Sequence, residues 1–80
     1  MIRYKLKECM SKKQFKDDKR ITMIVVAEAT GIHRTTLSKI ANIKQYKTST
    51  DVLDRLCEYF DIEIGDLIEH VKEENPTETE

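Results

Sequence analysis

The feature that most constrains the fold is Gly31, which lies between two short segments with helical spacing of apolar residues. Glycine readily takes the positive φ angle that ends a helix. Before it, Ala27 is small enough to let a second helix cross close by. After it, Ile32, Leu37 and Ile40 supply the apolar side of that second helix. The pattern predicts two short helices that are joined by a tight turn and packed at a steep angle.

Over residues 22–42 the chain resembles the Cro/repressor family of helix-turn-helix transcription regulators, which are also called xenobiotic-response-element-like regulators. The likeness continues in Ser-Thr-Asp-Val-Leu-Asp-Arg-Leu-Cys (49–57) and Glu-Ile-Gly-Asp-Leu (63–67), which look like the capped fourth helix and short fifth helix of compact bacterial members. The resemblance implies an all-α fold, a compact five-helix lambda-repressor-like DNA-binding domain with a helix-turn-helix.

Size and composition agree with a small helical domain. The chain has 80 residues, of which 36% are charged, with two glycines and one proline. Scarce glycine and proline together with apolar residues at helical spacing favour an all-helical domain. A chain this short buries about 60% of the surface of its unfolded form, which leaves little room for a deep substrate cleft. With no nucleophile beside a base and no glycine-rich phosphate loop, we expect a binding protein and not an enzyme.

The cysteines and histidines do not indicate a reactive or metal site. Cys9 and Cys57 stand without a CxxC partner on apolar helix faces, where a free thiol behaves as a small hydrophobe. His33 and His70 have no Cys or His at ligand spacing beside them, so no metal site is expected. No apolar run approaches the ~20 residues that cross a bilayer, and no secretory signal is visible. We expect a cytoplasmic protein without a cofactor, membrane contact or small-molecule ligand.

The charge is divided sharply along the chain. Residues 1–47 hold 12 Lys and Arg against 4 acids, a net charge of +8, whereas residues 48–80 hold 2 against 11, a net charge of −9. Such asymmetry is typical of nucleic-acid binding by one face, although charged residues clustered on a solvated surface are the alternative. Because the basic part contains the predicted helix pair, double-stranded DNA is the favoured partner.

The apolar spacing predicts the first three helices at about residues 2–14, 23–29 and 34–41. At the start, the alternation of Ile2, Tyr4 and Leu6 also suits a strand, but it breaks at Glu8, so a helix is preferred. Residues 15–21 are predicted to be a long basic connection, and Thr22 a good N-cap. Residues 21–26 are rich in β-branched side chains that also suit a strand; the glycine turn that follows favours a helix.

The second half predicts two more helices. Ser49 can cap a helix that reaches Phe60 and faces the core with a stripe of Leu53, Leu56, Cys57 and Phe60. A fifth helix is expected over residues 64–71. The DNA-binding domain is therefore expected to span residues 1–71, followed by an acidic tail, residues 72–80, that is expected to be disordered.

The helix over residues 33–41 is expected to read DNA, because the second helix of such a pair enters the major groove in this fold. Arg34 suits the O6 and N7 acceptors of guanine, Thr35 can offer a hydroxyl or meet a thymine methyl, and Lys39 can reach guanine or a phosphate. By resemblance, positions 34, 35 and 39 match base-contacting positions of the family. The alternative is that the charged residues only solvate an exposed helix. The base-contacting candidates are Arg34, Thr35, Ser38 and Lys39.

Phosphate contacts are expected from the starts of helices and from nearby hydroxyl, amide and cationic groups. For Ser49 a purely structural cap is the favoured role, and His33 can equally be an imperfect cap. Arg20 joins the set if the connection folds toward the duplex. The phosphate-contacting candidates are Thr22, His33, Thr36, Asn42, Lys44, Lys47 and Ser49.

The predicted second helix departs from the family pattern. Met23 stands where the family often has a glutamine that bonds to phosphate, and Ile24 and Val25 replace polar residues on the outer side. Exposed contiguous apolar surface usually marks an interface. Cover from within the chain by Phe15 and Ile21 is the simpler explanation.

These observations predict a sequence-specific double-stranded DNA-binding transcriptional regulator, most simply a repressor. One reading helix sees few base pairs, so a homodimer is expected, with two such helices about 34 Å apart on a roughly palindromic operator. The helix over residues 64–71, with Val52 or Tyr59, is the expected dimer surface. The alternative function is an antitoxin-like or other protein-interaction module with a protein partner.

Overall fold

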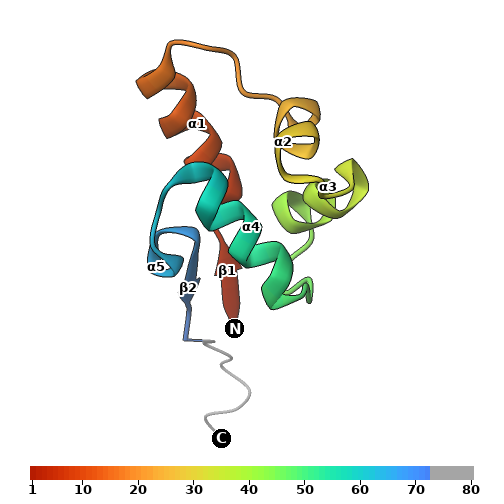
Figure 1. Cartoon of the computed structure of the whole chain (residues 1–80). Helices are drawn as coiled ribbons and strands as arrows, with labels where there is room; N and C mark the ends of the chain where they lie inside the picture. The colour runs from red at the N-terminus through yellow and green to blue at the C-terminus, as the bar shows by residue number, and fades with distance from the viewer. Residues whose placement is uncertain (73–80) are drawn as a thin grey trace, which may run out of the picture.

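The structure is a computed structural model that describes residues 1–72. Helices make up most of this part of the chain, and two short strands lie near its ends (Figure 1). The elements in chain order are β1 (Ile2–Tyr4), α1 (Leu6–Asp17), α2 (Met23–Thr30), α3 (Arg34–Asn42), α4 (Thr50–Phe60), α5 (Ile64–Leu67) and β2 (Ile68–His70). The expected compact five-helix fold is confirmed, and a small two-stranded sheet is added to the all-α architecture that was expected.

Each helix contributes at least one side chain to a single apolar core. The most deeply buried member from each helix is at most 1% exposed: Leu6, Val26, Leu37, Leu56 and Leu67. Burying a side chain of this size stabilises a fold by about 1.5–3 kcal/mol relative to leaving it exposed. Because one large apolar residue from every helix meets at the centre, the core holds α2 and α3 in a defined position against α1 and α4.

The helix pair forms as the glycine pattern predicts. The Thr22 hydroxyl oxygen accepts a hydrogen bond from the Val25 N–H at 3.3 Å and so caps the start of α2. Gly31 ends α2 with a φ of 75°, and its N–H donates to the Ala27 carbonyl at 2.9 Å. Ile32 and Leu37 are then buried on the inner side. Local capping and apolar spacing agree here, so this part of the prediction is confirmed.

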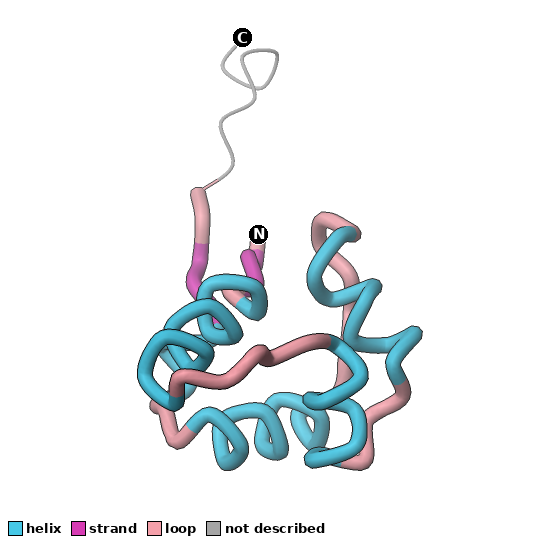
Figure 2. The backbone as a smooth tube through the Cα atoms, turned by 90° about the horizontal axis from the view of Figure 1, so that it is seen from above, coloured by secondary structure: helices cyan, strands magenta, loops and turns pink. Residues whose placement is uncertain are grey.

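The predicted first and fifth helices are wrong at their outer ends. Residues 2–4 and 68–70 form a two-stranded antiparallel sheet, magenta in Figure 2, with Ile2 opposite His70 and Tyr4 opposite Ile68. The backbone of Val71 donates to and accepts from that of Met1, both at 2.8 Å. The alternation of Ile2 and Tyr4 is therefore that of a strand. The helix prediction was wrong here because the strand with which residues 2–4 pair lies at the other end of the described chain.

The first helix also extends further than the spacing predicts. It runs to Asp17, and Asp18 ends it with a φ of 53° while its N–H donates to the Gln14 carbonyl. An ion pair of 3.0 Å between Lys13 and Asp17 supports this last turn. The expected connection over residues 15–21 is therefore shorter, residues 18–22, and Figure 1 shows it passing from α1 to α2. The expected acidic tail lies outside the described residues apart from Lys72.

Candidate nucleic-acid interface

Helix α3 has one buried side and one exposed side. Leu37 and Ile40 are buried in the core. The four predicted base-contacting residues are all exposed and line one shallow hollow together with Met23 of α2: Arg34, Thr35, Ser38 and Lys39. The structure thus brings together on one surface the four side chains that the sequence places on the outer side of this helix.

The cationic groups of this hollow are available to an external anion. Within residues 1–72, neither Arg34 nor Lys39 forms an ion pair. The Lys39 ammonium lies 5.9 Å from the centroid of the Tyr46 ring, a cation–π distance that holds it near the end of α3. An uncompensated guanidinium and ammonium on one helix face suit the acceptor groups of guanine and the phosphate backbone.

Three predicted phosphate contacts lie at helix starts. Thr22 and Ser49 are the N-caps of α2 and α4, and the Ser49 hydroxyl accepts from the Val52 N–H at 3.2 Å, so Ser49 caps α4 as predicted. His33 is the N-cap residue of α3 without a side-chain capping bond, as expected of an imperfect cap. Thr36 is half-buried in the first turn of α3. Their contacts with phosphate stay predictions.

Asn42, at the end of α3, is engaged within the protein. Its side-chain amide donates to the Ser38 carbonyl at 2.9 Å and to the Ser38 hydroxyl at 3.3 Å. Its side-chain oxygen accepts from the Lys7 ammonium at 3.0 Å, which ties α1 to α3. These bonds give Asn42 a structural role, and a phosphate would have to compete with them.

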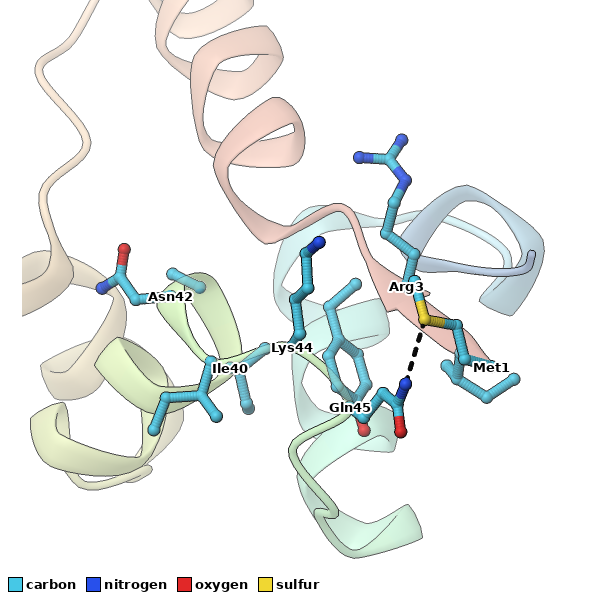
Figure 3. A pocket seen from close by; sticks show the side chains of 10 residues that line it. Met1, Arg3, Ile40, Asn42, Lys44 and Gln45 are labelled. Carbon is cyan, nitrogen blue, oxygen red and sulfur yellow. Dashed lines mark hydrogen bonds between the residues drawn. The ribbon is translucent and has the colours of Figure 1, made fainter. Parts of the chain in front are cut away.

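Lys44 and Lys47 lie in the loop between α3 and α4, and both are exposed. Figure 3 shows Lys44 in a second hollow, between the start of the chain and the end of α3, where the Gln45 amide donates to the Met1 sulfur at 3.2 Å. The Tyr4 hydroxyl donates to the Tyr46 carbonyl at 2.6 Å and anchors the loop. The loop is therefore attached to β1 while its two lysines face outward.

The other cation of that second hollow, Arg3, is neutralised within the protein. Its guanidinium contacts Glu69 at 2.6 Å and Glu8 at 3.2 Å, and the hydrogen bond to Glu69 raises the pKa of Arg3. Lys44 has no ion pair within residues 1–72. Arg20 lines a different hollow with Phe15 and Lys19, so the structure does not place it among the α3 side chains.

Apolar residues on α2 remain uncovered. Ile24 is 51% exposed and Val25 also lies at the surface. The expected cover by Phe15 and Ile21 is wrong: Phe15 is 91% exposed on α1, and Ile21 is buried in the core. The Ile21 N–H donates to the Gln14 side-chain oxygen at 2.9 Å, which turns the connection inward before it reaches α2. The apolar surface of Ile24 and Val25 is therefore open to solvent.

The two free thiols belong to α1 and α4 and not to α3. Cys9 is buried and Cys57 half-buried, and burial raises the pKa of both. A raised pKa keeps a cysteine in the unreactive thiol form at neutral pH. Among residues 1–72 no group of three or more His, Cys, Asp or Glu side chains is arranged to hold a metal ion. In the same residues, every helix is too short or too polar to cross a membrane.

Two residues near α3 are not among the contact candidates predicted from the sequence. Met23 lines the hollow of α3, and Tyr46 lies beneath Lys39. A partial signal existed for Met23, because it stands where the family often has a glutamine that bonds to phosphate and it begins the helix that crosses α3. Tyr46 carries no such signal because its position depends on the loop's contact with Tyr4.

These features define a helix-turn-helix DNA-binding domain. They are a helix pair linked by a glycine, a core that joins five helices and an exposed basic side on the second helix of the pair. The chain belongs to the Cro/C1-type HTH DNA-binding domain family, whose model matches residues 5–73. The family predicted from the sequence is thereby confirmed. No curated protein and no solved structure matches the chain significantly.

Proposed function

We propose that this chain is a sequence-specific double-stranded DNA-binding transcriptional regulator that reads the major groove with residues 33–41. The observation that carries the proposal is the shared hollow of Arg34, Thr35, Ser38 and Lys39 on the exposed side of α3. The opposite side of α3 is anchored in the core, so these side chains are presented on a rigid element. Membership of a DNA-binding family supports the same conclusion.

The spacing of these side chains suits the edges of neighbouring base pairs. Arg34 and Ser38 are four residues apart, as are Thr35 and Lys39, so each pair lies on adjacent turns of one helix face. Arg34 offers two N–H groups for the O6 and N7 atoms of guanine. Phosphate contacts would fix the position of α3 along the duplex. They would come from residues that flank α3 in the chain: the helix caps Thr22 and Ser49 and the loop lysines Lys44 and Lys47.

We propose further that the chain acts as a homodimer and, most simply, as a repressor whose bound dimer obstructs RNA polymerase. One α3 contacts only a few base pairs, and a two-fold pair of them would bind half-sites about 34 Å apart. The expected dimer surface must be redefined, because the helix predicted over residues 64–71 ends at Leu67. Half-buried Val52 and Tyr59 of α4 with exposed Ile64 of α5 are the apolar residues that support this surface.

A second candidate function is an antitoxin-like or other protein-interaction module. Exposed Ile24 and Val25 favour it, since contiguous apolar side chains at a surface are typical of interfaces. This function does not require α3 to read bases. A stable complex with a protein partner that forms through α2 would support it.

Selection of bound duplexes from random double-stranded DNA by the full chain tests the first proposal. We expect enrichment of one inverted repeat whose half-sites are one duplex turn apart. Enrichment of a single, non-repeated site would contradict the dimer but not base reading. A chain that is folded by circular dichroism and enriches no sequence would contradict sequence-specific binding.

A further inference from the structure

Met23 borders the hollow of α3 although it belongs to α2. It is the first residue of α2 and is half-buried, with part of its side chain packed against the core. Its remaining surface lines the hollow beside Arg34, Thr35, Ser38 and Lys39. A group that enters this hollow to reach the α3 side chains therefore also meets Met23.

The start of α2 is held in place beside α3. The Thr22 hydroxyl accepts from the Val25 N–H at 3.3 Å and fixes the first turn. Val26, one turn along, is fully buried in the core next to which Met23 packs. Met23 is therefore a positioned side chain on a rigid element rather than one on a mobile loop.

The chemistry of the thioether limits what Met23 can recognise. It has no N–H or O–H group, so it cannot donate a hydrogen bond to a phosphate oxygen or to an acceptor on a base edge. It is apolar, polarizable and adaptable in shape. On the base edges of the major groove, the 5-methyl group of thymine is the apolar feature.

We infer that Met23 is a specificity-determining residue that contacts the 5-methyl group of a thymine in the bound duplex. The inference rests on the proposed function, because it requires α3 to lie in the major groove. It assigns to α2 a part of the base reading, next to the polar contacts of Arg34 and Lys39. The selected duplex should then contain a thymine near the bases that those two residues contact.

Replacement of single thymines by uracil tests this contact, since uracil lacks only the 5-methyl group. Dissociation constants are measured for the full chain on the selected duplex with each thymine replaced in turn. At one position per half-site, we expect uracil to weaken the wild-type chain about fourfold, the effect of exposing one buried methyl group. Met23→Ala should bind the thymine duplex more weakly and show no loss with uracil at that position.

Two further variants keep the test decisive. Met23→Leu retains an apolar side chain and should retain the sensitivity to uracil. Met23→Gln has a similar length but a polar end and should lose that sensitivity, even if Met23→Ala is unstable. Thr35→Ser serves as the matched control, because Thr35 is the other side chain suited to a thymine methyl.

The possible outcomes separate the inference from the function on which it rests. If every uracil effect persists in Met23→Ala and Met23→Gln, or disappears only in Thr35→Ser, the assignment to Met23 is wrong. A wild-type chain that is indifferent to every thymine methyl also overturns it. In each of these cases a sequence has still been selected, so sequence-specific binding stands. Selection of no sequence overturns both.

Discussion

The turn between α2 and α3 depends on the backbone φ angle of one residue, Gly31. Its φ of 75° lies in the left-handed region, which L-residues with a Cβ rarely adopt. A Cβ placed there would lie 3.3 Å from Nη1 of Arg55, whose guanidinium donates to the Thr30 carbonyl at 3.3 Å. Arg55 thus occupies the space that a larger residue would need, and it also satisfies a carbonyl at the end of α2.

We expect Gly31→Ala to lower the free energy of unfolding by about 1–2 kcal/mol, because alanine must take the left-handed conformation. Denaturation in urea, monitored by circular dichroism, measures the change. Gly65→Ala is the matched control, since it lies within α5 and its added Cβ meets no atom within 4 Å apart from its chain neighbours and the backbone of its own helix. The control should be neutral or gain up to about 1 kcal/mol. Equal losses in the two variants would argue against the strain at Gly31.

We expect Arg34→Ala to reduce binding selectively. Loss of a bidentate contact with guanine should remove about 1–3 kcal/mol of discrimination at one base-pair position, with a small change on unrelated DNA. Competition binding to the selected duplex and its single-base variants measures this. Arg34→Lys keeps the charge but not the planar fork, so it should lose most of the same discrimination. A uniform loss on all sequences would mean that Arg34 contacts only phosphate.

At the scale of elements, the capping residues determine where the helices of the pair and α4 begin. Thr22 and Ser49 each satisfy a backbone N–H of the first turn, whereas His33 does not. Their positions follow from local sequence, because a hydroxyl side chain directly before an apolar-patterned segment is a helix start signal. The observed bounds of α2, α3 and α4 accordingly lie within one residue of the predicted ones.

We expect Ser49→Ala to destabilise the chain by about 1 kcal/mol through loss of the cap on α4. Ser49→Gly should cost only a few tenths of a kcal/mol, because glycine leaves the first turn open to water. Thermal and urea denaturation of the two variants give the comparison. If Ser49→Ala left stability unchanged and weakened DNA binding instead, Ser49 would be a phosphate contact and not a structural cap.

The two strands lie in segments for which the local sequence wrongly predicted helices. Residues 2–4 and 68–70 are too short to form a sheet alone, and each needs the other as its partner. Arg3 and Glu69 lie opposite one another and form a 2.6 Å ion pair across the two strands. Such a pairing depends on residues that are 66 positions apart, so periodicity within either segment could not predict it.

At the scale of the whole molecule, the two charged halves of the chain are partly interleaved. Arg3 from the basic half is neutralised by Glu69 of the acidic half. Arg34, Lys39 and Lys44 have no such partner within residues 1–72. The cationic surface free of ion pairs is therefore smaller than the charge of +8 on residues 1–47 implies, and α3 with the loop that follows contributes Arg34, Lys39 and Lys44 to it.

We expect Lys44→Ala to weaken binding to all DNA sequences alike and to reduce the slope of log affinity against log salt by about one unit, because one phosphate contact is lost. Titrations at several salt concentrations measure the slope. Lys12→Ala is the matched control, since Lys12 lines a hollow between α1 and the end of α4. An equal change of slope for both variants would indicate a general effect of charge rather than a contact by Lys44.

The sequence by itself determined the helix pair, its caps and the outer side of α3, because these depend on residues within one or two turns of each other. It also carried the likeness to the family to which the chain belongs. Only the tertiary structure decided that residues 2–4 form a strand, that Phe15 lies in solvent and that Met23 joins the hollow of α3. Each of these outcomes depends on how distant segments pack, and that information is absent from local spacing.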